Sequence, residues 1–341
     1  DSWSKRKQTM FQHVEASAGD RARWIGTNLY YHRRDVAYLN FVLSKDCSVL
    51  DIGCGNGWLL SQLNAKVKCG IDLSPSMVDV AKKTCPEATI IQADIESRLD
   101  LKKIRGLGLF DYIILSDTLA FLDDIEVGLS HVRKLCVPST RVILSRYNQL
   151  WEPMLKFGEL IGRKQRVRFD LNWISYDDVR SFCALSELDL LTSESHQIIP
   201  FRLFGLGHLI NKWLAPLPII RALNLRQYVI ARPTINRKHL KPSVSVIVPV
   251  RNEAGNIEPA VKRLSKFPGE IELIYVEGNS SDNSWDEIQR VKAEYKDINI
   301  VALKQPGKGK GDAVHYAFQQ ASGDILMILD GDLTVPPEDM I

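Results

Sequence analysis

The sequence lacks the features that mark several common classes of protein. It contains no apolar run long enough to span a lipid bilayer. Its six cysteines include no Cys-x-x-Cys pair, and no histidine stands at metal-ligand spacing from them, so no zinc site is indicated. The formal net charge is only +3, and no basic run is interleaved with aromatic residues, which argues against a nucleic-acid partner.

The cysteines lie mostly in or beside predicted strands, and we interpret them as small buried residues. Cys54 stands inside a glycine-rich turn with no base beside it, which favours a packing role over that of a nucleophile. Unpaired cysteines are typical of a reducing compartment, so we predict a cytoplasmic location. The sequence begins with Asp1 rather than methionine, which leaves open whether a targeting segment precedes it.

The length of 341 residues predicts two domains, each large enough to bury a core of its own. Residues 233–242 combine proline with basic residues and show no apolar periodicity, which is typical of a linker. We therefore predict a helical cap over residues 1–40, a first domain over residues 41–232 and a second domain over residues 243–341.

The first domain is organised around residues 49–60, where an apolar run ends in an acid and glycine then occupies every second position. This pattern predicts a strand, a tight turn and the start of a helix. Gly53, Gly55 and Gly57 allow the turn and leave no side chain in the way of a nucleotide. A glycine-rich turn alone is not specific, because ordinary loops and dinucleotide enzymes also contain one.

The strands that follow also end in polar residues. Predicted strands over residues 66–72 and 89–93 end at Asp72 and Asp94, and the next one ends at Ser116 and Asp117. Asp72 lies at the distance from the first glycine, about 20 residues, at which Rossmann-type folds place the acid that binds ribose. These side chains should therefore meet along one edge of a parallel sheet.

As a set, Asp51-x-Gly53-x-Gly55-x-Gly57, Asp72 and Asp94-Ile95 resemble class I S-adenosylmethionine-dependent methyltransferases over about residues 25–232. The resemblance implies an α/β fold with a Rossmann-like seven-stranded sheet and S-adenosylmethionine as cofactor. Dinucleotide enzymes are less similar, because Trp58 stands where their third glycine belongs. The residues that the resemblance places at the cofactor are Asp51, Gly53, Cys54, Gly55, Gly57, Asp72, Leu73, Asp94, Ile95, Ser116 and Tyr31.

Three segments are candidates for the acceptor side of this site. Residues 116–124 form the loop at which similar enzymes position the acceptor, and Asp117 is our candidate catalytic residue; it could equally cap the following helix. Tyr31 belongs to an aromatic group on a predicted helix that either touches ligand or only packs. Residues 147–173 form a long, irregular, basic and aromatic insertion, which we expect to bind the acceptor or to form a solvated lid.

Residues 200–222 are apolar, with basic residues between the apolar ones. Such a segment either lies on a membrane surface as a peripheral contact or packs on its own domain, and the second arrangement is the commoner one.

The second domain again alternates strands and helices, which predicts a further α/β unit. A predicted strand over residues 325–329 leads directly into Asp330-Gly331-Asp332. Two carboxylates that bracket one residue at the end of a strand can hold a hard divalent cation, and such a cation can neutralise a diphosphate leaving group.

Residues 244–253, 276–284 and 309–314, together with this D-x-D motif, resemble family 2 inverting glycosyltransferases of the A-type fold. The resemblance covers about residues 243–341 and implies the N-terminal, nucleotide-binding half of that fold, with Mg²⁺ or Mn²⁺ held by Asp332 and Asp330. Gly278 departs from the family, whose second strand ends in two acids. The residues implied at the nucleotide-sugar are Pro249, Arg251, Glu253, Glu277 and Asp330.

In this family the catalytic base lies C-terminal to the D-x-D motif. We therefore expect the chain to be a fragment of a larger fused protein, with a second domain that is inactive in sugar transfer as it stands.

Three functions remain open at this point. The first is methyl transfer to an oxygen or nitrogen of a glycan-related or small-molecule acceptor, in a bifunctional protein with a nucleotide-sugar glycosyltransferase. The second is a glycosyltransferase of polysaccharide or lipid-linked glycan synthesis with an accessory methyltransferase domain. The third is a non-enzymatic cofactor-binding module.

Overall fold

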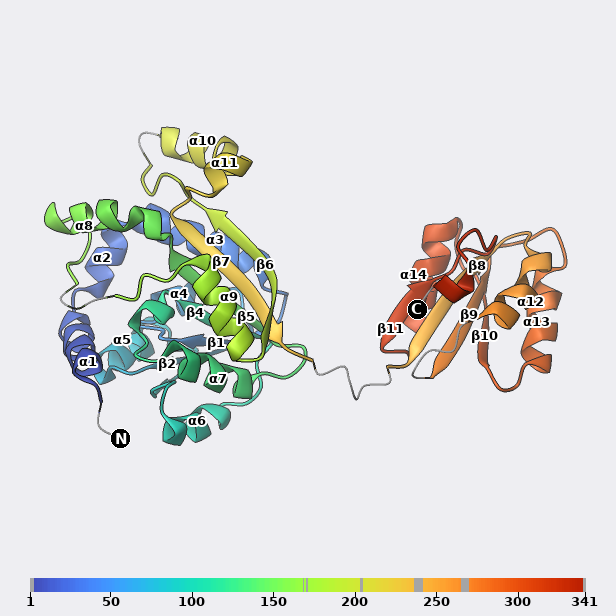
Figure 1. The fold of residues 1–341 in the computed structure, drawn as a ribbon, viewed down its shortest axis with the longest axis horizontal. Helices are drawn as coiled ribbons and strands as arrows, with labels where there is room; N and C mark the ends of the chain where they lie inside the picture. Colours follow the sequence, from blue (N-terminus) through green and yellow to red (C-terminus); the bar gives the residue numbers. More distant parts are fainter. Residues whose placement is uncertain are drawn as a thin grey trace. The chain divides into compact units, whose positions relative to one another are not determined.

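The computed structural model of the protein describes residues 3–167, 169, 171–202, 205–235, 242–264 and 270–339. The chain divides into two compact units, Asp1–Ile235 and Asn236–Ile341, here called unit 1 and unit 2 (Figure 1). Residues 236–241, most of the predicted linker, lie outside the described residues.

Unit 1 is built on a seven-stranded sheet of order β3-β2-β1-β4-β5-β7-β6. The first five strands pair in parallel, whereas β7 is antiparallel to both β5 and β6. This confirms the predicted Rossmann-like sheet of seven strands. The strands are β1 (Ser48–Ile52), β2 (Val67–Asp72), β3 (Thr89–Gln92), β4 (Tyr112–Ser116), β5 (Arg141–Tyr147), β6 (Leu188–His196) and β7 (Arg226–Pro233).

Helices cover both faces of this sheet, which is why β1 and β4 are apolar on both sides. On one face Leu50 packs with α6 (Arg98–Arg105), α7 (Ile125–Leu135) and α9 (Tyr176–Leu185). On the other face the apolar cluster is completed by α3 (Leu29–Val42), α4 (Trp58–Gln62) and α5 (Pro75–Thr84). The remaining helical segments of unit 1 are α1 (Lys5–Ser17), α2 (Arg21–Thr27), η1 (Thr118–Phe121), η2 (Gln149–Trp151), α8 (Glu152–Leu160), α10 (Leu206–Trp213) and α11 (Pro218–Arg221).

One sequence-based expectation about unit 1 needs correction. The insertion at residues 147–173 is not irregular throughout, because it contains η2 and α8; Pro153 at the first turn of α8 and Glu152 at its positive end both favour a helix start. The helix that carries Tyr31 is α3, which begins directly after Asn28, where α2 ends.

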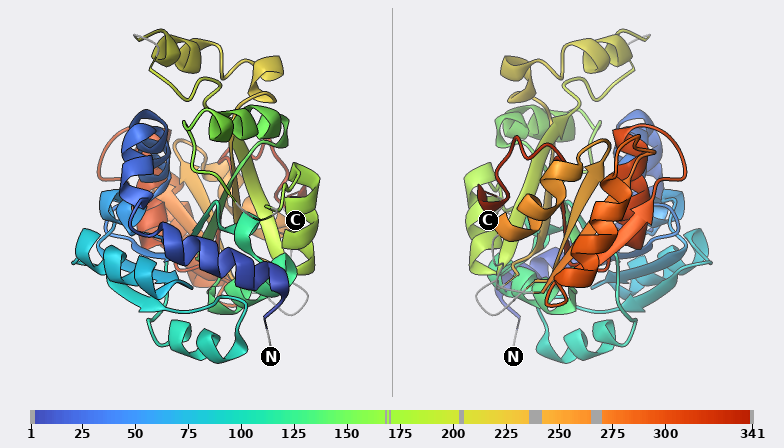
Figure 2. Two further views of the ribbon diagram at one scale, coloured as in Figure 1. Left: turned by 90° about the vertical axis from the view of Figure 1, so that its left-hand side faces the viewer. Right: turned by 90° about the vertical axis from the view of Figure 1, so that its right-hand side faces the viewer.

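Unit 2 contains a four-stranded parallel sheet of order β10-β9-β8-β11. Helices α12 (Ala254–Arg263) and α13 (Ser284–Glu294) pack on one face, and α14 (Lys310–Gln320) packs on the other (Figure 2). The alternation of strands and helices predicted for this half is therefore confirmed. Its strands are β8 (Val244–Val250), β9 (Ile271–Glu277), β10 (Asn299–Lys304) and β11 (Ile325–Ile328), and a short helix, η5 (Pro337–Asp339), follows them.

Candidate active sites

Unit 1 contains a cavity at the carboxyl ends of its first four strands. Parallel strands end at one edge of a sheet, so the turns after β1, β2, β3 and β4 meet there and line the cavity. Helices α1 and α2 also contribute to the wall, together with Lys164, Gln165, Val167 and Leu171. The residues from the strand ends are Gly53 and Gly55 after β1, Asp72 and Leu73 after β2, Asp94 and Ile95 after β3, and Ser116, Asp117 and Thr118 after β4.

The glycine turn after β1 has left-handed backbone conformations at Gly53, Gly55 and Gly57, with φ of 77°, 53° and 75°. A Cβ at Gly53 would lie 2.7 Å from the Oγ1 of Thr118, and one at Gly57 would lie 3.0 Å from the Cα of Ala81. A Cβ at Gly55 would have no neighbour within 4 Å. Two of the glycines therefore allow close packing, and Gly55 exposes its backbone to the cavity.

Asp72 braces this turn from the end of β2. Its Oδ2 accepts a hydrogen bond from the backbone amide of Gly55 at 2.8 Å, and its Oδ1 accepts one from the amide of Ser74 at 2.9 Å. Burial raises the pKa of Asp72, although these two hydrogen bonds oppose the shift. The carboxylate thus joins the β1 and β2 turns on the cavity wall.

Asp51, at the end of β1, is 1% exposed, and its Oδ1 has no hydrogen-bond partner within the described ranges. Burial, reinforced by the charge of Asp72, raises the pKa of Asp51 to about 7. A buried carboxyl with an unsatisfied oxygen is costly unless a cationic or hydrogen-bonding group meets it. The unsatisfied oxygen of Asp51 is therefore the feature of this buried carboxyl that calls for a partner.

Helix α1 is fastened over the cavity by charged contacts. The Nζ of Lys7 lies 2.6 Å from Asp94 and 2.7 Å from Glu96, and Lys7 is only 5% exposed. Burial disfavours the ammonium, but the hydrogen bonds to Asp94 and Glu96 outweigh it and raise the pKa of Lys7. Eight residues further along α1, Glu15 accepts a hydrogen bond from the hydroxyl of Ser74 at 2.5 Å. Both contacts hold α1 against the ends of β2 and β3.

A buried cation, Arg226 at the start of β7, organises the other side of the cavity. Its guanidinium pairs with Asp35 at 3.1 Å and also with Asp117. It donates further hydrogen bonds to the hydroxyls of Ser116 at 2.9 Å and Ser145 at 2.8 Å. One arginine therefore connects α3 with the ends of β4 and β5.

Aromatic rings enclose this cation. The guanidinium of Arg226 lies 5.7 Å from the ring of Tyr31, 5.5 Å from that of Tyr147 and 5.6 Å from that of Tyr228. The hydroxyl of Tyr228 also donates to Asp35. Tyr31 thus belongs to the surroundings of Arg226, and it is absent from the described lining of the cavity.

Asp117 has a left-handed backbone, with φ of 62°, which is uncommon for a residue other than glycine. Among the described residues its side chain makes no capping hydrogen bond to η1, whereas Asp124 caps α7 by accepting from the amide of Val127 at 2.9 Å. The alternative interpretation of Asp117 as a helix cap is therefore wrong. Its carboxylate pairs instead with Arg226.

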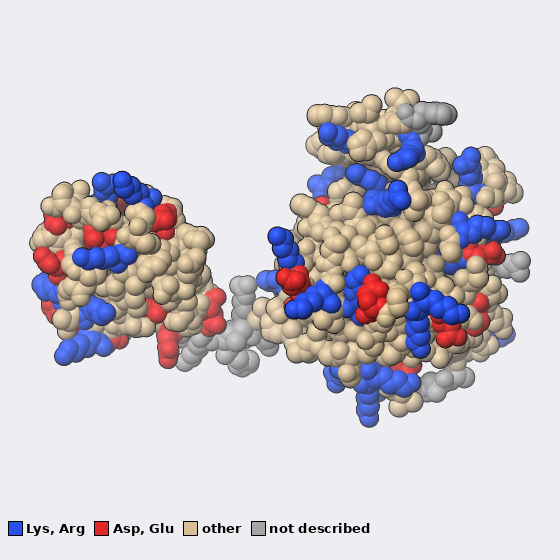
Figure 3. All heavy atoms as spheres, turned by 180° about the vertical axis from the view of Figure 1, so that it is seen from behind, with Lys and Arg blue, Asp and Glu red and all other residues tan. Residues whose placement is uncertain are grey.

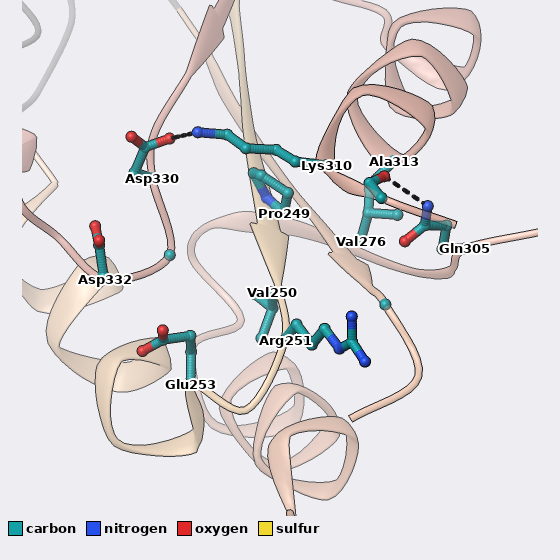
Figure 4. Close-up of a pocket in the computed structure, with 13 residues that line it drawn as sticks. Pro249, Val250, Arg251, Glu253, Val276, Gln305, Lys310, Ala313, Asp330 and Asp332 are labelled. Carbon is teal, nitrogen blue, oxygen red and sulfur yellow. Dashed lines mark hydrogen bonds and ion pairs between the residues drawn. The ribbon is translucent and has the colours of Figure 1, made fainter. Parts of the chain in front are cut away.

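Unit 2 contains a second pocket at the carboxyl ends of its strands (Figure 4). Residues after β8 form one side, Lys310 and Gln305 reach in from α14 and the preceding loop, and Asp330, Gly331 and Asp332 close it after β11. The predicted residues Pro249, Arg251, Glu253, Asp330 and Asp332 all line this pocket. Glu277 is absent from the described lining; it is 6% exposed and accepts a hydrogen bond from the amide of Ser280 at 2.5 Å.

The two acids of the D-x-D motif have different partners. Asp330 pairs with Lys310, and the Oδ1 of Asp332 accepts a hydrogen bond from the amide of Thr334 at 3.1 Å. Hydrogen bonds from Thr334 lower the pKa of Asp332 and keep it ionised. Within the described ranges no group of three or more His, Cys, Asp or Glu side chains is arranged to hold a metal.

Comparison with known protein families identifies the two domains to which these sites belong. The model of the family described as "Methyltransferase domain" matches residues 49–139, and that of "Glycosyl transferase family 2" matches residues 245–341. This chain joins a methyltransferase domain to a family 2 glycosyltransferase domain. The first match covers the glycine turn and the ends of β1 to β4, and the second covers the whole D-x-D pocket.

Curated relatives of the chain include glycosyltransferases. It is 35% identical over 97 residues to dolichol-phosphate mannosyltransferase from Pyrococcus furiosus, covering 28% of this chain and 27% of that protein. It is likewise 35% identical over 102 residues to undecaprenyl-phosphate 4-deoxy-4-formamido-L-arabinose transferase from Proteus mirabilis, covering 28% of this chain and 31% of that protein. The chain thus spans less than a third of the length of either relative.

Solved structures similar to the chain include methyltransferases. One is an S-adenosylmethionine-dependent methyltransferase from Thermotoga maritima, described as a possible histamine N-methyltransferase, with 15% identity, a TM-score of 0.47, and coverage of 65% of this chain and 99% of that chain. Another is the N-methyltransferase NodS from Bradyrhizobium japonicum in complex with S-adenosyl-L-homocysteine, with 15% identity, a TM-score of 0.45, and coverage of 66% and 98%. At these levels the likeness concerns the fold alone.

In the methyltransferase domain, most of the predicted cofactor residues meet in one cavity. Seven of them, named above with the strand ends, line it; Asp51, Cys54, Gly57 and Tyr31 lie outside its described lining. Cys54 is buried, and burial raises the pKa of its thiol.

Sequence reasoning missed the contribution of the N-terminal helix to the methyltransferase cavity. Met10, Phe11, His13 and Val14 of α1 line the cavity, although residues 1–24 carry only a weak apolar pattern. Arg226 was also missed, because the residues around it give no local sign of its partners Asp35 and Asp117.

Proposed function

We propose that the chain transfers the methyl group of S-adenosylmethionine to an oxygen or nitrogen of a glycan-related or small-molecule acceptor. The observation that carries this proposal is the single cavity in which Gly55, Asp72, Asp94 and Ser116 meet at the ends of adjacent strands. The matched methyltransferase family supports it. The glycan-related acceptor is proposed because the same chain carries a glycosyltransferase domain.

The residues present fit this cofactor. S-adenosylmethionine supplies a methyl group activated by a sulfonium. In the proposed complex Asp72 would bind the ribose hydroxyls, Gly55 would leave room for the ligand, and Asp51 would face the ammonium of the methionine end. Asp94 would lie at the adenine end, where its contact with Lys7 ties α1 over the ligand.

Catalysis by such a site rests mainly on positioning. Holding the acceptor atom in line with the methyl group can contribute about 7–11 kcal/mol without any fixed triad of catalytic residues. We propose Asp117 as the side chain that contacts the acceptor, because it lines the cavity and Arg226 holds its Oδ1 in place.

Calorimetric titration of the chain with S-adenosylhomocysteine, and separately with UDP or GDP in the presence of MnCl₂, tests this assignment. We expect S-adenosylhomocysteine to bind with one site. Failure to bind it would overturn the proposal, whereas binding of a nucleotide without it would favour the second function below. Extracts supplied with methyl-labelled S-adenosylmethionine then identify the acceptor.

The raised pKa of Asp51 predicts that cofactor affinity depends on pH. Below about pH 7 the carboxyl of the free protein holds its proton, and a cationic ligand group must displace that proton. We therefore expect the affinity for S-adenosylhomocysteine to rise between about pH 6 and about pH 8, with protons released on binding. In the Asp51→Asn variant the affinity should fall and this pH dependence should disappear.

The raised pKa of Asp51 also predicts that the stability of the protein depends on pH. An unfolded aspartate loses its proton near pH 3.8, whereas folded Asp51 keeps its proton up to about pH 7. The free energy of unfolding should therefore fall as the pH rises through that interval.

Calorimetry in two buffers of different ionisation enthalpy measures the number of protons released when S-adenosylhomocysteine binds. Asp79→Asn, an exposed change on α5, is the matched control and should leave the proton release unchanged.

A second candidate function is transfer of a sugar from a nucleotide-sugar, with methylation as an accessory step. The specific observation in its favour is the second pocket, which the acidic residues Glu253, Asp330 and Asp332 line (Figure 4). Oxygen ligands of this kind fit Mg²⁺ or Mn²⁺. The sugar acceptors in the names of the two relatives suggest a lipid-linked glycan. A non-enzymatic module is not favoured, since both matched families are transferases.

Removing the second acid of the motif tests the nucleotide site. We expect Asp332→Asn to weaken Mn²⁺-dependent binding of the preferred nucleotide at least about tenfold, because one charged metal ligand is lost. Asp286→Asn, on the exposed first turn of α13, serves as the control. If both variants bind equally well in calorimetry, Asp332 is no metal ligand.

The cytoplasmic location, the absence of a nucleic-acid partner and the peripheral membrane contact through residues 200–222 remain predictions. None of the helices in the described part of the chain has the length and hydropathy needed to cross a membrane.

A further inference from the structure

Helix α10 is built with its polar side inward. Its buried residues are Gly207 and Asn211, whereas Leu206, Leu209 and Trp213 are 61%, 52% and 67% exposed. The amide of Asn211 donates to the carbonyl of Ile199 at 2.7 Å and accepts from the amide of that residue at 2.9 Å. A surface helix normally does the opposite and buries its apolar stripe.

The chain from the end of α10 to Asn224 is also held in place by hydrogen bonds from polar side chains. The buried Asn224 donates hydrogen bonds to the carbonyls of Ser195 and Ala215, both at 3.0 Å. Asn148 donates to the carbonyl of Ala222 at 2.8 Å. These contacts hold α10 and α11 in place while apolar side chains remain in water. Among the described residues from 201 to 223, the exposed apolar ones are Phe201, Leu206, Leu209, Trp213, Leu214, Leu217, Ile219 and Leu223.

A second exposed apolar face lies on α8. The helix has no buried residue within the described structure, and its Met154, Phe157 and Leu160 are 59%, 55% and 82% exposed. Leu150 and Ile161, which flank it, are 65% and 55% exposed. Positions 150, 154, 157 and 161 recur at helical spacing, so they share one side of the helix.

The two apolar faces belong to one end of unit 1, the upper end in Figure 1. The indole Nε1 of Trp151, just before α8, donates to the carbonyl of Leu223 at 2.7 Å, which joins the base of α8 to the end of the α10–α11 segment. The chain that leaves α8 reaches Lys164 and Leu171 on the wall of the methyltransferase cavity. The apolar end therefore adjoins the active site.

Basic residues outnumber acidic ones at this end. Its acidic residues Glu152 and Glu159, both on α8, are paired with lysines, Glu152 with Lys156 at 2.7 Å and Glu159 with Lys164. The sequence contains no aspartate or glutamate from Ser195 to Asn252. Arg202 and Lys212 are exposed between the apolar residues, and the Nζ of Lys212 lies 5.3 Å from the ring of Trp213. In the space-filling view the lobe formed by α10 and α11 shows basic and apolar atoms (Figure 3).

We propose that the exposed side chains of α8 and of the α10–α11 segment bind the surface of an anionic membrane. Apolar side chains would enter the boundary between headgroups and acyl chains, and the basic residues would meet lipid phosphates. Tryptophan and lysine are typical of this depth in a bilayer. The charge favours lipid over another copy of this end, since two basic surfaces would repel each other.

Sedimentation of the full chain with lipid vesicles tests the proposal. We expect it to bind vesicles that contain phosphatidylglycerol, to bind pure phosphatidylcholine more weakly, and to be released by salt. Leu209→Glu with Trp213→Glu, and separately Met154→Glu with Phe157→Glu, should each weaken binding about tenfold or more. Leu99→Glu, a 77% exposed leucine on α6, is the matched control and should bind as the unmodified chain does.

The alternatives give different results. Absence of vesicle binding by a chain that still binds S-adenosylhomocysteine would overturn the membrane surface and leave the proposed function intact. Equal losses in the Leu99→Glu control would overturn it as well, because the effect would then be one of general charge. A dimer in light scattering that dissociates in the Leu209→Glu and Trp213→Glu variant would show that a second copy covers this end.

Discussion

Arg226→Leu is expected to destabilise unit 1 by about 3–5 kcal/mol, because it leaves buried carboxylates without their cation. Arg226 is 1% exposed, and its partner Asp35 is 5% exposed. Burial disfavours the guanidinium, but the charges of Asp117 and Asp35 outweigh it and raise the pKa of Arg226. Leucine fills much of the space and provides none of the charge.

Urea unfolding followed by tryptophan fluorescence measures this loss, since unit 1 contains every tryptophan except Trp285. Arg232→Leu is the matched control on the same strand. Its side chain is 28% exposed and lies 3.9 Å from Asp189, so this change should cost less than about 1 kcal/mol. Similar costs for the two variants would refute the special role of the buried cation.

A charge-neutral variant separates electrostatics from packing. Combining Arg226→Leu with Asp35→Asn and Asp117→Asn removes the uncompensated charges, and we expect it to recover much of the lost stability. If the triple variant is as unstable as Arg226→Leu alone, the loss comes from packing. The asparagine at position 117 should also lower methyl transfer while S-adenosylhomocysteine still binds.

The contacts of Arg226 could not be predicted from the sequence. Its partners Asp35 and Asp117 lie 191 and 109 residues away in the chain. The contacts form because β7 inserts antiparallel between β5 and β6, and no local pattern reports where a closing strand places its first residue. The same holds for Lys7, whose partner Glu96 is 89 residues distant.

The cavity wall made by the strand ends was predictable for the opposite reason. Each of Gly55, Asp72 and Asp94 follows directly on an apolar strand, so a local pattern marks it. Parallel strands bring their carboxyl ends to one edge, so these local signals are sufficient to place the residues together. The apolar spacing of α8 was equally local, but periodicity does not tell whether a stripe faces the core or the solvent.

The second large effect concerns the glycine turn after β1, where one substitution should weaken cofactor binding and another should mainly lower stability. We expect Gly55→Ala to lower the affinity for S-adenosylhomocysteine at least about tenfold, because the added methyl group would project into the open space of the cavity. The left-handed backbone at φ 53° adds a strain of about 1–2 kcal/mol. The domain should therefore remain folded, with a modestly lower stability.

Gly57→Ala is expected to act mainly on the fold. Its added Cβ would lie 3.0 Å from the Cα and 3.1 Å from the carbonyl oxygen of Ala81, and backbone atoms of α5 cannot turn aside as a flexible side chain can. Overpacking of about 1–3 kcal/mol would add to the strain of the left-handed backbone. Calorimetry and urea unfolding of both variants give the two readouts.

Gly108→Ala is the control that separates the effect of backbone strain from the effect of the glycine's place in the turn. Gly108 has a φ of 109°, and an added Cβ there would have no neighbour within 4 Å, so this variant carries the backbone cost without touching the cavity or α5. It should bind S-adenosylhomocysteine as the unmodified chain does. If Gly55→Ala binds equally well, the cofactor does not approach the turn at Gly55, and the arrangement proposed for Asp51 and Asp72 around the ligand fails with it.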